Sequence, residues 1–279
     1  MKKDKKIEKS KVFYKLYVVN IVITIVFICL ISLLCSTFSS RLILNNFIAF
    51  NEDMIAEKVN VLDDRVKHLD ETVDLIIGDE STFKFLMTNE KDYEKPTAIL
   101  KIIRRFRNIC SSNSLVRGIC LVDLQRQIVI TESTKMTIEG NRYDRYQGQN
   151  SFVVTDDGEE RKLEFVKRFE PIRGKKVVYM ILTVDEEVFT SNLLVGKESE
   201  MLKSCLMTRQ GDVLTADGLD ECAPAVQKEL QGLEKGTEKF ETSGQKLVLY
   251  KNPSKVSDMS IAAYEDYTYL EGQTRELKQ

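Results

Sequence analysis

The hydrophobic pattern begins with a long uncharged run near the N-terminus. No charged residue occurs between Lys15 and Arg41, and fifteen of the residues from Leu16 to Phe38 are Leu, Ile, Val or Phe. As a helix, these 25 uncharged positions reach roughly 37 Å at about 1.5 Å per residue, more than a hydrocarbon core of about 30 Å. Residues 16–38 are therefore predicted to form a transmembrane helix.

The flanking charges predict its orientation. Residues 1–15 carry seven lysines against Asp4 and Glu8, which keeps this basic tail in the cytoplasm and places residues after about 40 outside. A cleaved signal peptide is the alternative, but its apolar core is usually about 7–15 residues and ends at a small-residue cleavage site. The longer run favours an uncleaved, single-pass anchor in the plasma (cytoplasmic) membrane.

A second pattern predicts one long helix over residues 41–78, ended by Gly78. Its apolar positions recur at alternating steps of four and three, at Ile55, Val59, Leu62, Val66, Leu69, Val73 and Ile76. This period is typical of a coiled-coil seam, so we expect a homodimer through the 41–78 helix. A helix that packs on its own domain gives a similar stripe and remains the alternative.

The pattern then changes from helix to strand. Residues 78–94 are predicted to be a connector and 95–110 a second helix, with apolar strands afterwards. The acidic run over 156–160 lacks the alternation of a calcium loop and is interpreted as a hairpin turn. The predicted strands cover residues 118–123, 127–133, 151–155, 162–172, 176–184, 237–243, 245–252 and 259–265.

An internal repeat indicates the architecture. CLVDLQRQIVITE from Cys120 aligns without a gap with CLMTRQGDVLTAD from Cys205, and ILTVDEEVF from Ile181 matches IAAYEDYTY from Ile261. Each unit thus contains an apolar hairpin and a later strand that ends in an acid. The sequence predicts an α+β fold with a first unit over 79–190, a second over 191–270 and a tail over 271–279.

Composition excludes several classes of function. Without residues 1–15 the chain carries 34 basic and 41 acidic groups, a net charge of −7, which argues against a nucleic-acid partner. The single histidine, His68, lies on the heptad helix, which removes Ser-His-Asp, Cys-His and His-rich zinc chemistry. No catalytic residue, metal site or cofactor is therefore predicted. Four cysteines lie outside the anchor without a zinc spacing or a fixed pairing: Cys110, Cys120, Cys205 and Cys222.

The order of anchor, long helix, second helix and repeated β units resembles the double Cache (dCache) sensor domains of bacterial membrane receptors. The likeness covers about residues 41–270 and includes phrases such as GICLVD from Gly118 and ILTVDEEVF from Ile181. It looks closest to the extracytoplasmic parts of histidine kinases and of membrane-bound AraC-type regulators. The resemblance implies two PAS-like antiparallel sheets, distal and proximal, with a small-molecule pocket in the distal unit.

The resemblance also implies candidate ligand-binding residues. In amino-acid-binding members a Tyr/Arg/Trp cluster holds the ligand carboxylate, and an Asp near the end of the last strand holds the amine. This chain has no tryptophan, so the ligand class stays open, and Asp185 can equally cap the following helix. The matching positions are Arg142, Tyr143, Arg145, Tyr146, Tyr179 and Asp185.

Together these features predict a membrane-anchored, extracytoplasmic ligand-sensing domain of a bacterial signal-transduction receptor. A small molecule in the distal unit would shift the long helix and, through it, the membrane span. We expect a second span and an output module to belong to the receptor but not to this chain. The alternative is a coiled-coil, membrane-anchored scaffold or protein-interaction module of the cell envelope without a small-molecule ligand.

Overall fold

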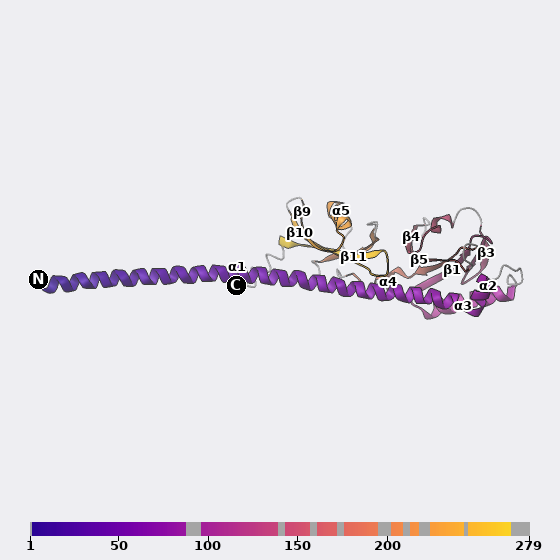
Figure 1. Ribbon diagram of the computed structural model, residues 1–279, viewed down its shortest axis with the longest axis horizontal. Coiled ribbons are helices and arrows are strands. Elements are labelled where there is room, and N and C mark those ends of the chain that lie inside the picture. The colour runs from indigo at the N-terminus through magenta and orange to yellow at the C-terminus, as the bar shows by residue number, and fades with distance from the viewer. Residues whose placement is uncertain are drawn as a thin grey trace.

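One very long helix runs beside two β-sheet units that follow one another along it (Figure 1). Candidate positions at Arg142, Cys222, 157–160 and 271–279 lie outside the described residues. The computed structural model describes residues 2–87, 96–138, 143–156, 161–171, 176–194, 202–208, 213–217, 224–242 and 245–268.

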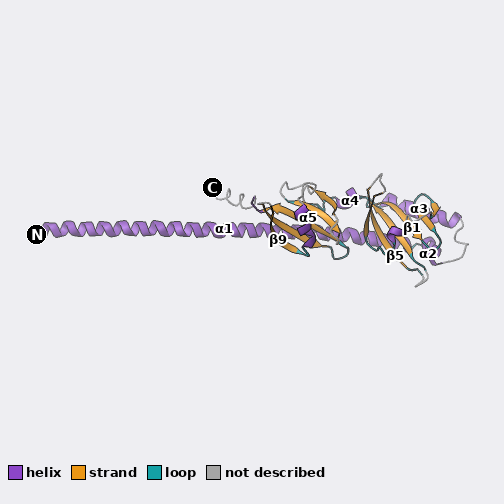
Figure 2. Ribbon diagram, turned by 90° about the horizontal axis from the view of Figure 1, so that it is seen from above, coloured by secondary structure: helices purple, strands orange, loops and turns teal. Residues whose placement is uncertain are grey.

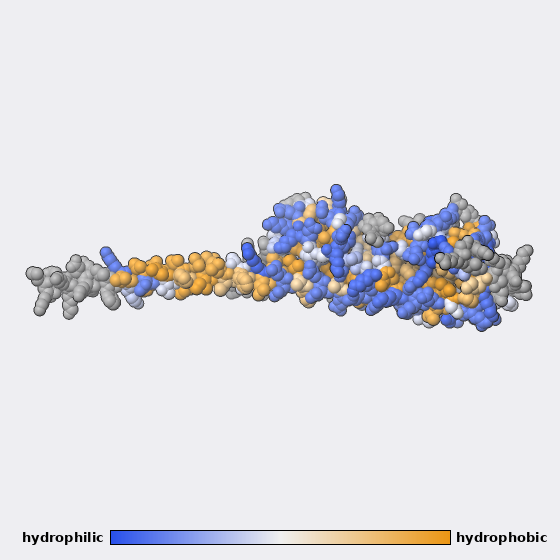
Figure 3. All heavy atoms as spheres, viewed as in Figure 1, coloured by the Kyte–Doolittle hydropathy of each residue, from blue (hydrophilic) through white to orange (hydrophobic). Residues whose placement is uncertain are grey.

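Helix α1 (Lys2–Ile77) joins the predicted membrane span and the predicted long helix without a break. Its N-terminal part projects beyond both sheets, and Figure 3 shows an apolar band on this part. Side chains there face outward, as with Leu33 at 68% exposure. The most apolar stretch has a mean hydropathy of 3.0 with none of it buried, so α1 is long and apolar enough to cross a membrane.

The C-terminal part of α1 carries a buried stripe that packs into the main core of the chain. Both sheets contribute to this core, through residues such as Leu182 and Ile261. The prediction of a dimer seam is therefore wrong for these positions, because their side chains already pack inside one chain. A helix lying along its own domain, the alternative, produces the same spacing. The affected residues are Ile55, Val59, Leu62, Val66, Leu69, Val73 and Ile76.

The distal unit contains two further helices next to the end of α1. Helix α2 (Glu80–Met87) occupies residues that were predicted to be a connector, so that prediction is wrong. The Asp79 carboxylate accepts hydrogen bonds from the backbone N–H groups of Ser81 and Thr82 and so starts this short helix. Helix α3 (Pro96–Ser112) buries its apolar face in the core.

The distal sheet is six-stranded and antiparallel in the order β3-β2-β1-β6-β5-β4. The short helix α4 (Glu186–Thr190) follows its last strand. The strands are β1 (Val116–Asp123), β2 (Ile128–Thr131), β3 (Lys135–Thr137), β4 (Phe152–Asp156), β5 (Arg161–Phe169) and β6 (Val178–Val184).

The proximal sheet has five antiparallel strands in the order β8-β7-β11-β10-β9. Helix α5 (Pro224–Gly232), which the sequence analysis did not predict, lies over this sheet (Figure 2). The strands are β7 (Lys203–Thr208), β8 (Val213–Asp217), β9 (Gly236–Thr242), β10 (Gln245–Pro253) and β11 (Met259–Asp266).

The internal repeat corresponds to equivalent strands of the two sheets. The aligned hairpins are β1–β2 and β7–β8, and the aligned later strands β6 and β11 are their neighbours in each sheet. In the distal sheet Cys120 pairs with Ile181, and in the proximal sheet Cys205 pairs with Ala262. The predicted α+β fold with two antiparallel sheets is confirmed.

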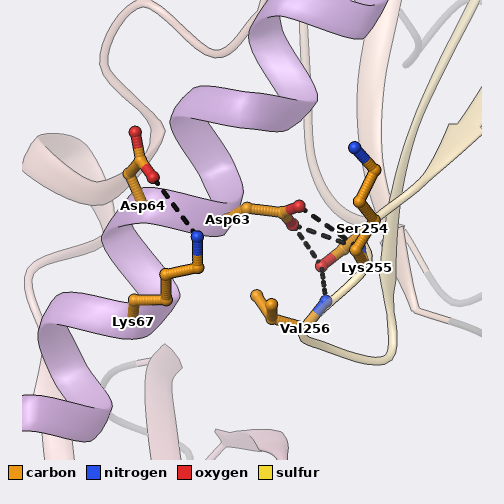
Figure 4. Close-up of polar contacts among 6 residues, drawn as sticks. All are labelled: Asp63, Asp64, Lys67, Ser254, Lys255 and Val256. Carbon is orange, nitrogen blue, oxygen red and sulfur yellow. Dashed lines mark hydrogen bonds and ion pairs between the residues drawn. The ribbon is translucent and has the colours of Figure 1, made fainter.

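Polar contacts hold α1 to both units. In Figure 4 the buried Asp63 points from α1 to the β10–β11 turn. Its carboxylate accepts hydrogen bonds from the Ser254 hydroxyl at 2.6 Å and the Lys255 backbone N–H at 3.3 Å. Farther along the helix, Asp70 pairs with Lys167 of β5. The helix is thus fixed to the proximal turn and to the distal sheet.

A buried polar group lies between α1 and the proximal sheet. The Asn51 amide donates a hydrogen bond to the Glu265 carboxylate at 2.9 Å, and the Tyr250 hydroxyl donates to the same oxygen. Burial raises the pKa of Glu265, against the opposing effect of these two hydrogen bonds. The carboxyl group therefore binds its proton more tightly in the folded chain than in the unfolded chain.

A buried and an exposed leucine of α1 test the buried stripe. Leu69 is 0% exposed and Leu75 is 63% exposed. Leu69→Ala should lower the free energy of unfolding by about 2–5 kcal/mol, and the control Leu75→Ala by no more than about 0.5 kcal/mol. Chemical denaturation at two protein concentrations measures both. Similar losses in the two variants, or a loss at Leu69 that depends on concentration, would contradict intramolecular packing.

Glu265→Gln tests the buried carboxyl group through pH dependence. Because the folded pKa lies above the ordinary value of 4.5, stability from this group is full below that value and is lost as pH rises through the folded pKa. The variant should therefore lose less stability than the parent as pH rises from 4.5. Urea unfolding across pH measures this, and the exposed Glu238→Gln control should keep the parental slope.

Candidate functional site

The face of the distal sheet opposite α1 carries a second, separate apolar cluster. Strands β1, β2, β5 and β6 contribute its floor, and the segment over 143–150 lies across it. The short 3₁₀ helix η2 (Asp144–Tyr146) in this segment buries the Tyr146 ring against the sheet. The buried members are Val122, Val129, Tyr146, Val166, Tyr179 and Ile181.

A hydrogen bond between Tyr146 and Glu164 is the main polar contact of this cluster. Tyr146 is 2% exposed and Glu164 7%. The phenol donates to the Glu164 Oε2 atom at 2.7 Å. Burial, followed by this hydrogen bond to a carboxylate, raises the pKa of Tyr146. The phenol therefore stays protonated and remains a hydrogen-bond donor.

Tyr179 supplies a second buried phenol on β6. Its oxygen accepts a hydrogen bond from the Gly148 backbone N–H at 3.3 Å, and within the described part of the chain its own proton has no acceptor. Gly148 has φ of +79°, a left-handed conformation that favours glycine. The segment over 143–150 is thus held against the strands.

Two more predicted residues lie at the edge of this cluster. The Tyr143 and Tyr146 ring centroids are 6.1 Å apart. The exposed Arg145 guanidinium lies 5.1 Å from the centroid of the Tyr146 ring, within the range of a cation–π contact. The structure therefore brings together Tyr143, Arg145, Tyr146 and Tyr179, four of the predicted ligand-binding residues.

Asp185 makes different contacts. Its carboxylate accepts a hydrogen bond from the Val188 backbone N–H at 3.1 Å and caps α4, and it pairs with Arg117 at 2.8 Å. Burial acts to raise its pKa, but the hydrogen bonds from Arg117 and from the backbone outweigh burial and lower the pKa of Asp185. The capping alternative thus describes how the chain itself uses this side chain.

Glu164 is the site residue that the sequence analysis missed. It stands between Leu163 and Phe165 in a strand that is buried on both faces. An acid between apolar residues of such a strand needs a polar partner. Its position in the sequence was therefore the signal that could have indicated a site residue. The partner, Tyr146, could not be identified before the fold was known.

The cluster combines polar groups with an apolar floor. One carboxylate, two phenols and an exposed guanidinium surround an apolar floor, the mixture typical of small-molecule sites. Among the residues that the structure describes, no group of three or more His, Cys, Asp or Glu side chains could hold a metal ion.

No family model and no curated protein matches this chain. Solved structures do match. The sensory domain of the Campylobacter jejuni chemoreceptor Tlp3 (CcmL) has a TM-score of 0.60 at 11% identity, covering 84% of this chain and 99% of that one. The extracellular domain of the histidine kinase vpHK1S-Z8 gives 0.57 at 10% identity, covering 83% and 95%.

A third structure of the same kind is a domain of a sensory box/GGDEF family protein from Vibrio parahaemolyticus. Its TM-score is 0.56 at 11% identity, and the alignment covers 82% of this chain and 99% of that one. At these identities the comparisons concern the fold. This chain has the fold of bacterial sensory domains, as its resemblance to double Cache domains predicted.

Substitutions at Asp185 separate capping from ion pairing. Asp185→Ala should lower the free energy of unfolding by about 0.5–2 kcal/mol, because the α4 N-terminus loses its acceptor. Asp185→Asn keeps an acceptor and should lose clearly less. Thermal or chemical unfolding measures both variants. An equal loss in Asn and Ala would show that the pair with Arg117, rather than the cap, carries the effect.

Proposed function

We propose that this chain is the membrane-anchored, extracytoplasmic sensing part of a bacterial signal-transduction receptor. The apolar part of α1 would span the plasma membrane with the lysine-rich tail inside, and both sheets would lie outside. The sensory-domain fold and the long, exposed apolar helix support this arrangement.

The observation that carries the ligand proposal is the buried Tyr146–Glu164 pair, whose tyrosine belongs to the same cluster as Tyr179. Tyr146 occupies one Glu164 oxygen, and within the described residues the other has no hydrogen-bond donor. A ligand with an ammonium or another hydrogen-bond donor could donate to this second oxygen of Glu164. The Tlp3 sensory domain is described with isoleucine bound. Amino acids and amines are accordingly the first ligands to test.

Strand β5 offers a route from this site to α1. Glu164 faces the outer cluster, and Lys167 on the opposite face pairs with Asp70 of α1. Because side chains alternate along a strand, a shift of β5 on the ligand side moves both contacts. The ligand would change the receptor only if it binds one position of β5 more tightly than another.

The test is a thermal-shift panel on the full chain in nanodiscs, with amino acids, amines and small carboxylates. A ligand at 100 times its Kd should add about 2.7 kcal/mol of stability. Glu164→Gln and Tyr179→Phe should each weaken binding of the hit about tenfold or more, about 1.4 kcal/mol. A flat panel over a folded chain would contradict the proposal and favour an envelope scaffold.

The proximal unit contains a matched control pair. Tyr250 and Glu265 form a buried phenol–carboxylate contact of the same chemistry, on the other sheet. Tyr250→Phe and Glu265→Gln should leave the affinity for the hit unchanged. If they weaken binding as much as the distal variants do, the effect reflects general destabilisation and the site assignment is wrong.

A further inference from the structure

A cavity lies in the proximal unit, where β10 turns into β11 under the C-terminal end of α5. Its volume is about 550 Å³, within the range of about 300–1,000 Å³ for small-molecule sites. The walls come from β10, from the turn and from β11, and the residues after α5 close one side. The cavity shares no lining residue with the distal cluster.

Lys251 places a buried cation in this wall. It is 9% exposed, and its Nζ atom donates to the backbone oxygens of Leu230 at 2.9 Å and Gln231 at 3.3 Å, the last turn of α5. An ammonium group has three protons, so one remains available. Across the described residues no carboxylate pairs with it, and burial lowers the pKa of Lys251. An anion beside it would offset the cost of this burial.

Ser260 adds an unsatisfied hydroxyl to the same cavity. It is 3% exposed, and in the described part of the chain its Oγ atom has no hydrogen-bond partner. Ser260 lies on β11 opposite Met207 and next to the end of β10. A buried hydroxyl without a partner is destabilising, and a ligand oxygen would satisfy it.

Two acids limit the charge of the ligand. Glu234 and Asp258 also line the cavity but are exposed, so water and salt screen them. Lys251 offsets one negative charge on a ligand, whereas Glu234 and Asp258 would repel a second one. We propose that this cavity is a second ligand site, which takes a small monocarboxylate recognised by Lys251 and Ser260.

The cavity wall is connected directly to α1. The Ser254 hydroxyl donates to Asp63 of α1 at 2.6 Å and accepts from the Val256 and Ser257 backbone N–H groups at 3.2 and 2.9 Å (Figure 4 shows the first two of these contacts). Ser254 and Ser257 both line the cavity. A carboxylate bound there therefore acts on the same helix as a distal ligand, from a different unit.

Titration calorimetry of the full chain in nanodiscs tests this site, with acetate, propionate and L-lactate as probes. At least one acid should bind saturably. Lys251→Met should weaken its binding tenfold or more. Because Lys251 also holds the end of α5, Ser260→Ala serves as a second variant that keeps the charge, and it should weaken binding several-fold. The absence of saturable binding of all three acids to the parent chain would overturn the proposal.

Two controls assign any binding to this cavity. Lys246→Met removes an exposed lysine from the same strand and should leave the affinity unchanged. Glu164→Gln alters only the distal cluster and should also leave the affinity for the acid unchanged. Failure of the proximal site and failure of the distal site can therefore be told apart. Equal losses with Lys251→Met and Lys246→Met, or loss of acid binding with Glu164→Gln, would overturn the proximal assignment.

Discussion

The burial of one apolar stripe of α1 beneath two sheets is the interaction on which the structure depends. Leu69, Leu182 and Ile261 belong to one core, although they come from the helix, the distal sheet and the proximal sheet. The inner faces of both sheets are therefore covered largely by the same helix. The two units share a support, and a displacement of either sheet acts on α1.

This shared support explains where the polar contacts lie. Asp63 bonds to the proximal turn and Asp70 to β5 of the distal sheet, less than two helical turns apart on α1. Each contact joins α1 to a segment that also borders a candidate ligand site. A helix keeps its hydrogen bonds when it shifts as a rigid body, so movement at either contact would reach the apolar end of α1.

The sequence predicted the elements that have a strong local period or a repeat. The apolar span, the long helix and the β hairpins from Cys120 and Cys205 follow from such patterns. Short elements such as α2 and α5 were missed, because eight or nine residues give little periodic signal. The dimer seam was wrong for another reason. A stripe of apolar residues shows that a helix face is buried, but not what buries it.

Candidate site residues were predictable only in part, because their roles depend on partners far along the chain. Tyr146 and Tyr179, two of the positions that the resemblance implied, belong to one buried cluster, whereas Glu164 became visible only through its bond to Tyr146. Asp185, in contrast, was a predicted site residue that the chain uses for other contacts. Its position after a strand suited both a ligand and a helix cap, and only the distance to the Val188 N–H identifies the contact that it makes.

The two units share a strand order but cover their outer faces differently, and the two proposed ligand sites differ accordingly. The distal face lies under an irregular segment whose Tyr146 and Gly148 bond to the strands, so polar groups sit above the centre of the sheet. The proximal face lies under α5, whose Val226 and Leu230 pack on the strands. This apolar helix fills the centre of the outer face, and the cavity of about 550 Å³ lies at its end. The proposed ligand on this face would therefore lie beside the β10–β11 turn, which is the segment that contacts Asp63 of α1.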